Sequence, residues 1–216
     1  LVESDGRALA IAYADPGSPI ALRILTRDVS AAIDGDWVAL HVARAVRARR
    51  FVVGTNALRL VHGENDFLPG LVLDHYADVG VLAYDGAGAE RLWAPHAERI
   101  RQAAGVTAPS VPVVYIDEHG ARFEVDLVRG QKTGLFLDQR ENRLHVRELA
   151  AGARVLNLFC YTGGFSIHAA LGGARHVTSV DQAAPAMAAL ARNLAHNQLA
   201  ARDHELVVGD VFTFLA

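Results

Sequence analysis

The last third of the chain alternates apolar strands with helices, and this rhythm constrains the fold more than any other feature. Strands are predicted over 154–159, 176–180 and 206–208, and helices over 164–171 and 185–197. A helix between two strands returns the chain in the same direction, so the strands are expected to be parallel. The sequence therefore predicts an α/β fold with a doubly wound, Rossmann-like core, of which three strands are present.

The first strand of this core leads into a tight turn and a helix. Backbone amides and the helix N-terminus face a ligand at such a turn. A dinucleotide site needs a G-x-G-x-x-G pattern to admit a pyrophosphate, but Phe159 and Tyr161 stand where the earlier glycines would lie. A ligand without phosphates, such as S-adenosylmethionine, has no need of that pattern. A turn without any ligand is the alternative. The candidate binding residues are Asn157, Phe159, Tyr161, Gly163 and Gly164.

An aspartate ends each of the next two strands. Asp181 could accept hydrogen bonds from both hydroxyls of a ribose, in nicotinamide enzymes as well as in methyltransferases. Asp210 could accept the amino group of adenine, with Val211 or Phe212 packed on the ring. Helix capping is the alternative for both aspartates. The ends of all three strands should share one edge of the sheet, where ligands of this architecture bind.

Residues 1–28 predict two short strands, 8–13 and 20–25, which are too few to close a core. We therefore expect the chain to start inside a β-rich domain. A helix is predicted from about residue 36 to residue 50. Its four clustered arginines could contact phosphates or could simply form a solvated helix face. They are Arg44, Arg47, Arg49 and Arg50.

The middle of the chain predicts a β-β-α-β-β unit. Pro95 should disturb the first turn of its helix, because proline lacks the backbone N–H. Strands 58–61 and 71–74 flank a turn, a further strand is predicted over 79–84, the helix over 90–104, and a hairpin over 111–116 and 122–127.

The composition excludes several classes of protein. No apolar run approaches the roughly 20 residues of a membrane span, and residues 1–5 do not resemble a secretion signal. The single cysteine excludes an internal disulfide and fits a cytoplasmic protein. A net charge of −3 argues against a general nucleic-acid binder, and no histidine or cysteine cluster has the spacing of metal ligands.

Three segments together resemble the bacterial large-subunit ribosomal RNA cytosine-5 methyltransferases. These segments are Thr55–Leu71, Gly130–Arg140 and Phe159–Phe165. The resemblance implies the tail of a PUA domain over 1–30, a linker helix and small domain over 31–128, and the first half of a methyltransferase domain over 129–216. It also implies S-adenosylmethionine as cofactor and ribosomal RNA as partner.

The resemblance further implies that residues 136–140 help to enclose the cofactor. Phe136 could pack against it and Asp138 could meet its ammonium group, with Gln139 in the same segment. This chain departs from the family in having a short turn between the strands at 113–116 and 122–127, where members carry a longer insert. The Asp-Pro-Pro motif and the downstream cysteine region are expected beyond residue 216.

Cytosine C5 is a poor nucleophile, so a thiolate must first add at C6, and the base must leave its stack. Cys160 is either that nucleophile or a small residue packed beneath the cofactor. We expect the second, and therefore expect the catalytic residues beyond residue 216 and no methyl transfer by residues 1–216 alone.

Two other functions stay open from sequence. One is an oxidoreductase with a nucleotide cofactor on the same scaffold, and the other is a non-catalytic RNA-binding protein. The target base and the oligomeric state are open too, with a homodimer as one alternative.

Overall fold

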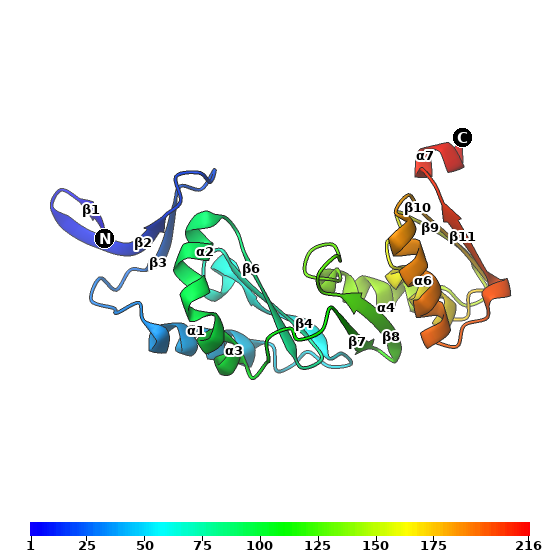
Figure 1. Cartoon of the computed structure of the whole chain (residues 1–216), viewed down its shortest axis with the longest axis horizontal. Coiled ribbons are helices and arrows are strands. Elements are labelled where there is room, and N and C mark those ends of the chain that lie inside the picture. Colours follow the sequence, from blue (N-terminus) through cyan, green and yellow to red (C-terminus); the bar gives the residue numbers. More distant parts are fainter. The chain divides into compact units, whose positions relative to one another are not determined.

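A computed structural model describes all residues 1–216 and divides the chain into two compact units (Figure 1). Unit 1 contains residues 1–53 and 57–112, and unit 2 contains residues 54–56 and 113–216. This division places residues 1–30 in unit 1 and residues 113–128 in unit 2. None of the helices combines the length and the apolar character needed to cross a bilayer.

Unit 1 begins with a three-stranded antiparallel sheet in the order β1-β2-β3. Its strands are β1 (Val2–Ser4), β2 (Arg7–Ala14) and β3 (Leu22–Thr26). The buried carboxylate of Asp15 accepts a hydrogen bond from the backbone N–H of Gly88, at 3.0 Å, in the first turn of α2 (Ala87–Trp93). Tyr13 donates to the carbonyl of Pro69 at 3.1 Å.

Arg23 makes a further connection, because this buried side chain forms ion pairs with Glu64 and Asp85. A buried guanidinium is costly without carboxylate partners, and both partners lie in the segment that follows the first sheet. These contacts explain why residues 1–30 pack as part of unit 1 and do not form a compact unit of their own.

The rest of unit 1 places helices on a second antiparallel sheet, in the order β4-β5-β6. Its strands are β4 (Ala57–His62), β5 (Leu71–Tyr76) and β6 (Val79–Tyr84). Its helices are α1 (Gly35–Ala48), α2 and α3 (Ala97–Ala104), with short 3-10 turns at Gly63–Asp66 and Ala94–His96. The turn containing Pro95 separates α2 from α3, as the missing N–H of proline predicts. Val38, Trp93 and Ile100 are fully buried in this core.

The predicted hairpin exists but belongs to unit 2. It consists of β7 (Val113–Glu118) and β8 (Ala121–Asp126), which form a separate two-stranded sheet. The helix α6 (Ala184–His196) binds the edge of β8, because the Asn193 side chain accepts the N–H of Glu124 at 2.8 Å. The hairpin therefore packs within unit 2, which contains the parallel strands, and not with the three strands and the helices that precede it in the sequence.

The remainder of unit 2 confirms the predicted Rossmann-like core. Three parallel strands lie in the order β11-β10-β9: β9 (Arg154–Leu158), β10 (His176–Asp181) and β11 (His204–Val208). The helices are α4 (Arg140–Leu149), α5 (Gly164–Leu171), α6 and α7 (Val211–Leu215), with 3-10 turns at Leu137–Gln139 and Ala201–Asp203. This sheet order brings the carboxyl ends of all three strands to one edge.

Candidate functional site

Asp181, the last residue of β10, joins the loops that follow all three parallel strands. Its Oδ2 accepts a hydrogen bond from the backbone N–H of Tyr161, and its Oδ1 accepts one from Ala183, both at 2.9 Å. Its backbone carbonyl accepts the N–H of Gly209 at 3.0 Å. Each carboxylate oxygen has two acceptor sites, so both oxygens retain capacity for a hydroxyl group of a ligand. Three of the predicted ligand-facing loops therefore meet at this residue.

The two glycines of the turn are required by close packing. Gly163 has a φ of 83°, and a Cβ added there would lie 2.0 Å from Cδ1 of Leu190 on α6. A Cβ on Gly164 would lie 2.9 Å from Cδ of Arg143 on α4. The turn thus rests directly on both helices, which fixes the position of its amides at the start of α5.

Two residues of this loop that are not glycine also adopt left-handed backbone conformations. Phe159 has a φ of 56° and Tyr161 a φ of 50°. Such conformations carry strain for residues other than glycine and are concentrated at functional sites. The strain is consistent with a loop whose shape serves a ligand.

Exposed aromatic rings lie beside Asp181 at this edge. The Phe159 side chain is 65% exposed and that of Phe212 is 73% exposed, with their ring centroids 6.0 Å apart. The predicted alternative at α7, Val211, is only 3% exposed and packs inward. The accessible apolar surface at this edge is therefore provided by Phe159 and Phe212.

Asp210 caps helix α7. Its Oδ1 accepts hydrogen bonds from the backbone N–H of Thr213 at 2.8 Å and from the Thr213 hydroxyl at 2.9 Å. These hydrogen bonds hold the pKa of the Asp210 carboxyl below its usual value. Helix capping, the alternative interpretation of Asp210, therefore accounts for the contacts of only one oxygen of its carboxylate.

Asn157 faces the inside of unit 2. Its Nδ2 donates to the hydroxyl of Ser166 at 2.8 Å, and Ser166 shares a hydrogen bond of 2.7 Å with Ser179. The side chain thus links β9 to α5 and β10 beneath the loop that was predicted to bind the ligand.

The segment 130–139 lies against the Gly-Gly turn. The hydroxyl of Tyr161 accepts the N–H of Gln131 at 2.8 Å and donates to the carbonyl of Gly134 at 3.3 Å. The Phe136 ring packs edge-on against the Tyr161 ring, with centroids 5.7 Å apart. Asp138 is exposed and accepts a hydrogen bond from the Gln139 side chain at 2.9 Å.

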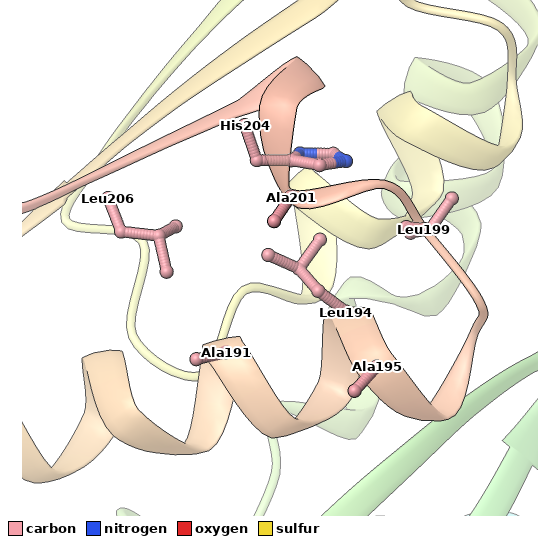
Figure 2. A pocket seen from close by; sticks show the side chains of 7 residues that line it. All are labelled: Ala191, Leu194, Ala195, Leu199, Ala201, His204 and Leu206. Atoms are coloured by element: carbon pink, nitrogen blue, oxygen red, sulfur yellow. The ribbon is translucent and has the colours of Figure 1, made fainter.

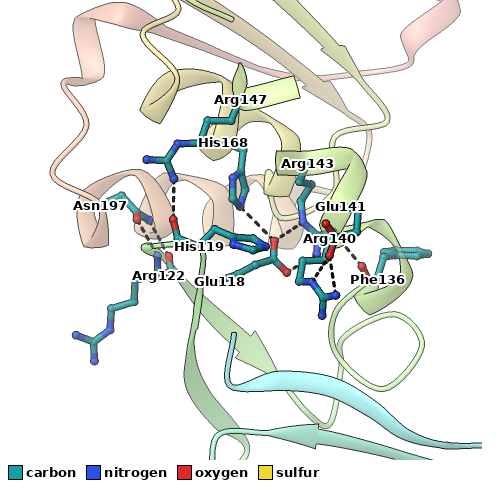
Figure 3. Close-up of polar contacts among 10 residues, drawn as sticks. All are labelled: Glu118, His119, Arg122, Phe136, Arg140, Glu141, Arg143, Arg147, His168 and Asn197. Atoms are coloured by element: carbon teal, nitrogen blue, oxygen red, sulfur yellow. Dashed lines mark hydrogen bonds and ion pairs between the residues drawn. The ribbon is translucent and has the colours of Figure 1, made fainter. Parts of the chain in front are cut away.

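A buried ionic cluster binds the backbone of this segment, and sequence reasoning missed it (Figure 3). Arg143 binds Glu118 through two hydrogen bonds, Nε to Oε1 and Nη2 to Oε2, each 2.7 Å long. His168 lies 3.2 Å from the same Oε1, and all three side chains are at most 2% exposed. Nη1 of Arg143 donates to the carbonyl of Phe136 at 2.9 Å. The cluster therefore holds the segment by its backbone.

The charge of Glu118 is stabilised within this cluster. Burial alone would raise the pKa of Glu118, but the hydrogen bonds from Arg143 and His168 outweigh burial and lower the pKa to about 2. The sequence contained a signal for the burial of Glu118. Val114, Ile116 and Glu118 are two residues apart along β7, so all three side chains lie on the same, buried face of the strand. The partners of Glu118, 25 and 50 residues later in the chain, gave no such signal.

Cys160 packs in the interior. Its side chain is buried, and its Sγ lies 3.3 Å from Sδ of Met187. Burial, together with the nearby Asp181 carboxylate, raises the pKa of the thiol to about 12. A thiol in this environment is a poor nucleophile, which supports the packing interpretation.

A small apolar pocket lies between α6 and β11 (Figure 2). It is lined by Ala191, Leu194, Ala195, Leu199, Ala201, His204 and Leu206. His204 begins β11, so the pocket opens beside the amino half of that strand and not at the edge that carries Asp181. Burial lowers the pKa of His204, which leaves the pocket without a charged group near neutral pH. It is not part of the candidate site.

Comparisons with known proteins agree on one family. The model of a family described as S-adenosylmethionine-dependent methyltransferase matches residues 94–211. A ribosomal RNA large subunit methyltransferase of Deinococcus radiodurans is 37% identical and is matched over 97% of this chain and 60% of its own length. The ribosomal RNA large subunit methyltransferase I of Escherichia coli is 33% identical, over 100% of this chain and 61% of its own length. The chain therefore spans about 60% of these curated relatives.

Solved structures give the same result. A Streptococcus mutans protein described as a SAM-dependent methyltransferase superposes with a TM-score of 0.86 and 27% identity, over 95% of this chain and 60% of that one. A methyltransferase solved in complex with S-adenosylhomocysteine (SAH) superposes with a TM-score of 0.84, also at 27% identity and with the same coverage.

Proposed function

We infer a function from the premise that this chain belongs to the S-adenosylmethionine-dependent methyltransferase family. We propose that its carboxyl edge binds S-adenosylmethionine and that the protein methylates large-subunit ribosomal RNA. The observation that carries the proposal is the convergence of three strand-end loops on Asp181, beside two exposed aromatic rings.

The residues at this edge fit the cofactor chemically. The free acceptor sites of Asp181 suit ribose hydroxyls, and the exposed Phe159 and Phe212 rings suit an adenine. The second oxygen of Asp210 suits the adenine amino group. Asp138 is exposed, and its negative charge suits the ammonium group of the methionine part. Phe136 and Gln139 lie in the same segment and could contact the cofactor beside it. S-adenosylmethionine, when bound, supplies an electrophilic methyl group.

The relatives support ribosomal RNA as the substrate, since those at 33–37% identity carry that activity in their names. We further propose cytosine C5 as the target and residues 1–30 as the tail of a PUA domain, on the motifs given above. Cys160 does not serve as the nucleophile for cytosine C6, because its thiol is buried with a pKa of about 12. The proposed chemistry therefore requires a thiolate other than this one.

Calorimetric titration of the chain with SAH and, separately, with NADH tests the cofactor assignment. We expect saturable binding of SAH and none of NADH. Saturable binding of NADH without binding of SAH would support the oxidoreductase alternative and overturn the proposal.

The substrate assignment needs a second experiment. Transfer of a tritiated methyl group to purified large-subunit ribosomal RNA, by the protein that includes the nucleophile, should label a single cytosine at C5 when the nucleosides are separated. Residues 1–216 alone should bind SAH without transferring the label. Label on a different base would refute cytosine C5 while leaving the family assignment intact.

A further inference from the structure

Three arginines on and just after α1 present their charges to solvent. Arg44 and Arg47 are exposed and lie three residues apart, which places them on one side of the helix. Arg50 is exposed in the turn that follows, and its Nη1 donates to the carbonyl of Arg47 at 3.0 Å. None of the three guanidinium groups forms an ion pair with a carboxylate. We call these residues, together with Phe51, the α1 arginine face.

Arg49, in the same cluster of sequence, has a different role. It forms an ion pair with Asp66 and donates to the carbonyls of Ala45 and Arg59 at 3.1 Å and 3.2 Å. These bonds satisfy carbonyl groups at the end of α1 and on β4. Arg49 therefore stabilises unit 1. The side chains of Arg44, Arg47 and Arg50 form no ion pair that would give them a similar structural role.

The charge of this face is unbalanced locally. No aspartate or glutamate occurs between residues 37 and 53, although the whole chain carries a net charge of −3. Because none of these three guanidinium groups pairs with a carboxylate, they create a positive field that attracts an anionic partner.

An exposed aromatic ring adjoins these charges. The Phe51 side chain is 74% exposed, and the guanidinium carbon of Arg50 lies 4.1 Å from its ring centroid. Val53, two residues after Phe51, is also 74% exposed. Arginines that flank an exposed ring are the combination by which proteins bind single-stranded nucleic acid, since guanidinium groups pair with phosphates and a ring stacks on a base.

We propose that the α1 arginine face binds a single-stranded segment of RNA, with the arginines on phosphates and Phe51 against a base. This proposal rests on the proposed function, because ribosomal RNA is the substrate that supplies such a segment. An anionic membrane would also meet the charges and could take up the ring, so vesicle binding is an arm of the test. A double helix would leave the ring without a stacking partner, because paired bases are not available to stack.

The test measures fluorescence anisotropy of a labelled oligouridylate of about 12 nucleotides, a length that matches common single-strand site sizes. The variant R44E/R47E/R50E should weaken binding by at least about tenfold. It should also reduce the slope of log affinity against log salt by about 2, since each lost phosphate contact on a single strand accounts for about 0.7. Phe51→Leu should weaken binding by about fivefold or more at an unchanged salt slope.

The control variant is R91E/R154E/R175E. It makes the same change in net charge at three exposed arginines that form no ion pair, two of them at the amino ends of β9 and β10. It should retain most of the affinity. Thermal unfolding and SAH titration should match the unaltered chain for all three variants, which shows that the fold and the cofactor edge are intact.

Equal weakening by the control variant would overturn the proposal, because net charge alone would then explain binding. Binding to phosphatidylserine vesicles without binding to RNA would also overturn it. If RNA does not bind while SAH does, this inference fails and the cofactor assignment stands. If SAH does not bind while RNA does, the cofactor assignment fails instead.

Discussion

The backbone N–H of Tyr161 donates to the carboxylate of Asp181 at 2.9 Å, so the acid that ends β10 shapes the loop that follows β9. Tyr161 in turn binds the segment 130–136 through its hydroxyl. One carboxylate therefore offers acceptors to a ligand and also orders two of the loops that would surround it. Binding and loop order should consequently change together when Asp181 is altered.

Asp181→Ala should lower the affinity for SAH by at least about tenfold, since it removes a charged acceptor worth roughly 1.5–3 kcal/mol. Calorimetric titration measures this effect. Asp117→Asn, at an exposed position on β7, is the matched control and should leave the affinity unchanged. An unchanged affinity in Asp181→Ala would rule out the assigned role.

The Glu118–Arg143 pair should make stability depend on pH in the acidic range. The folded-state pKa of Glu118, about 2, lies below its ordinary value of 4.5, so the stabilisation is fully present only at pH values well above 4.5. It is lost as the pH falls from about 5 towards 2. Urea unfolding across this range should show a falling free energy of unfolding.

Glu118→Gln should remove this acid dependence and destabilise the chain by about 3–5 kcal/mol at neutral pH, because Arg143 stays buried without a counter-charge. Glu141→Gln changes an exposed partner of Arg140 and should cost less than about 0.5 kcal/mol. Equal stability of the two variants would contradict the importance of the buried pair.

Gly163→Ala should destabilise unit 2 by about 2–4 kcal/mol. The added methyl group meets Leu190 at 2.0 Å, and the φ of 83° is unfavourable for alanine. Gly120→Ala provides the control, because its φ of 77° is similar but no atom lies within 4 Å of the new Cβ. Chemical unfolding should show a clearly larger loss for Gly163→Ala, and similar losses would show that packing against Leu190 is unimportant.

Cys160 should resist alkylation in the folded chain. At pH 8 a thiol with a pKa of about 12 is almost entirely protonated, and this one is also buried. Mass spectrometry should detect no adduct with iodoacetamide until urea unfolds the protein. Rapid modification of the folded chain would reopen the nucleophile interpretation.

The sequence predicted the parallel core well because its signals are local. Strand 154–158 is mostly apolar and leads into a glycine turn, and strand 176–181 is rich in β-branched residues and ends at an aspartate. These features depend on neighbouring residues only. The candidate residues around Asp181 could be placed at one edge for the same reason. Their detailed roles could not be predicted, as Asn157 shows: its partner Ser166 lies on the next helix, facing inward.

The unit boundaries could not be predicted because they depend on long-range contacts. Whether the hairpin 113–126 joins the preceding or the following segment is decided by Asn193 on α6. Whether residues 1–30 stand alone is decided by Asp15, Tyr13 and Arg23, whose partners lie 41–73 positions away in the sequence. Neither set of contacts leaves a periodic signal.

The three residues 54–56 belong to unit 2 although unit 1 flanks them on both sides in the sequence. Gly54 accepts the backbone N–H of His119, and the Asn56 side chain accepts that of Asp117 at 2.8 Å. A recombinant fragment that starts at residue 113 would leave these two amides of the β7–β8 hairpin without their acceptors. A single cut before residue 113 therefore cannot yield an intact second half, because residues 54–56 remain with the first half.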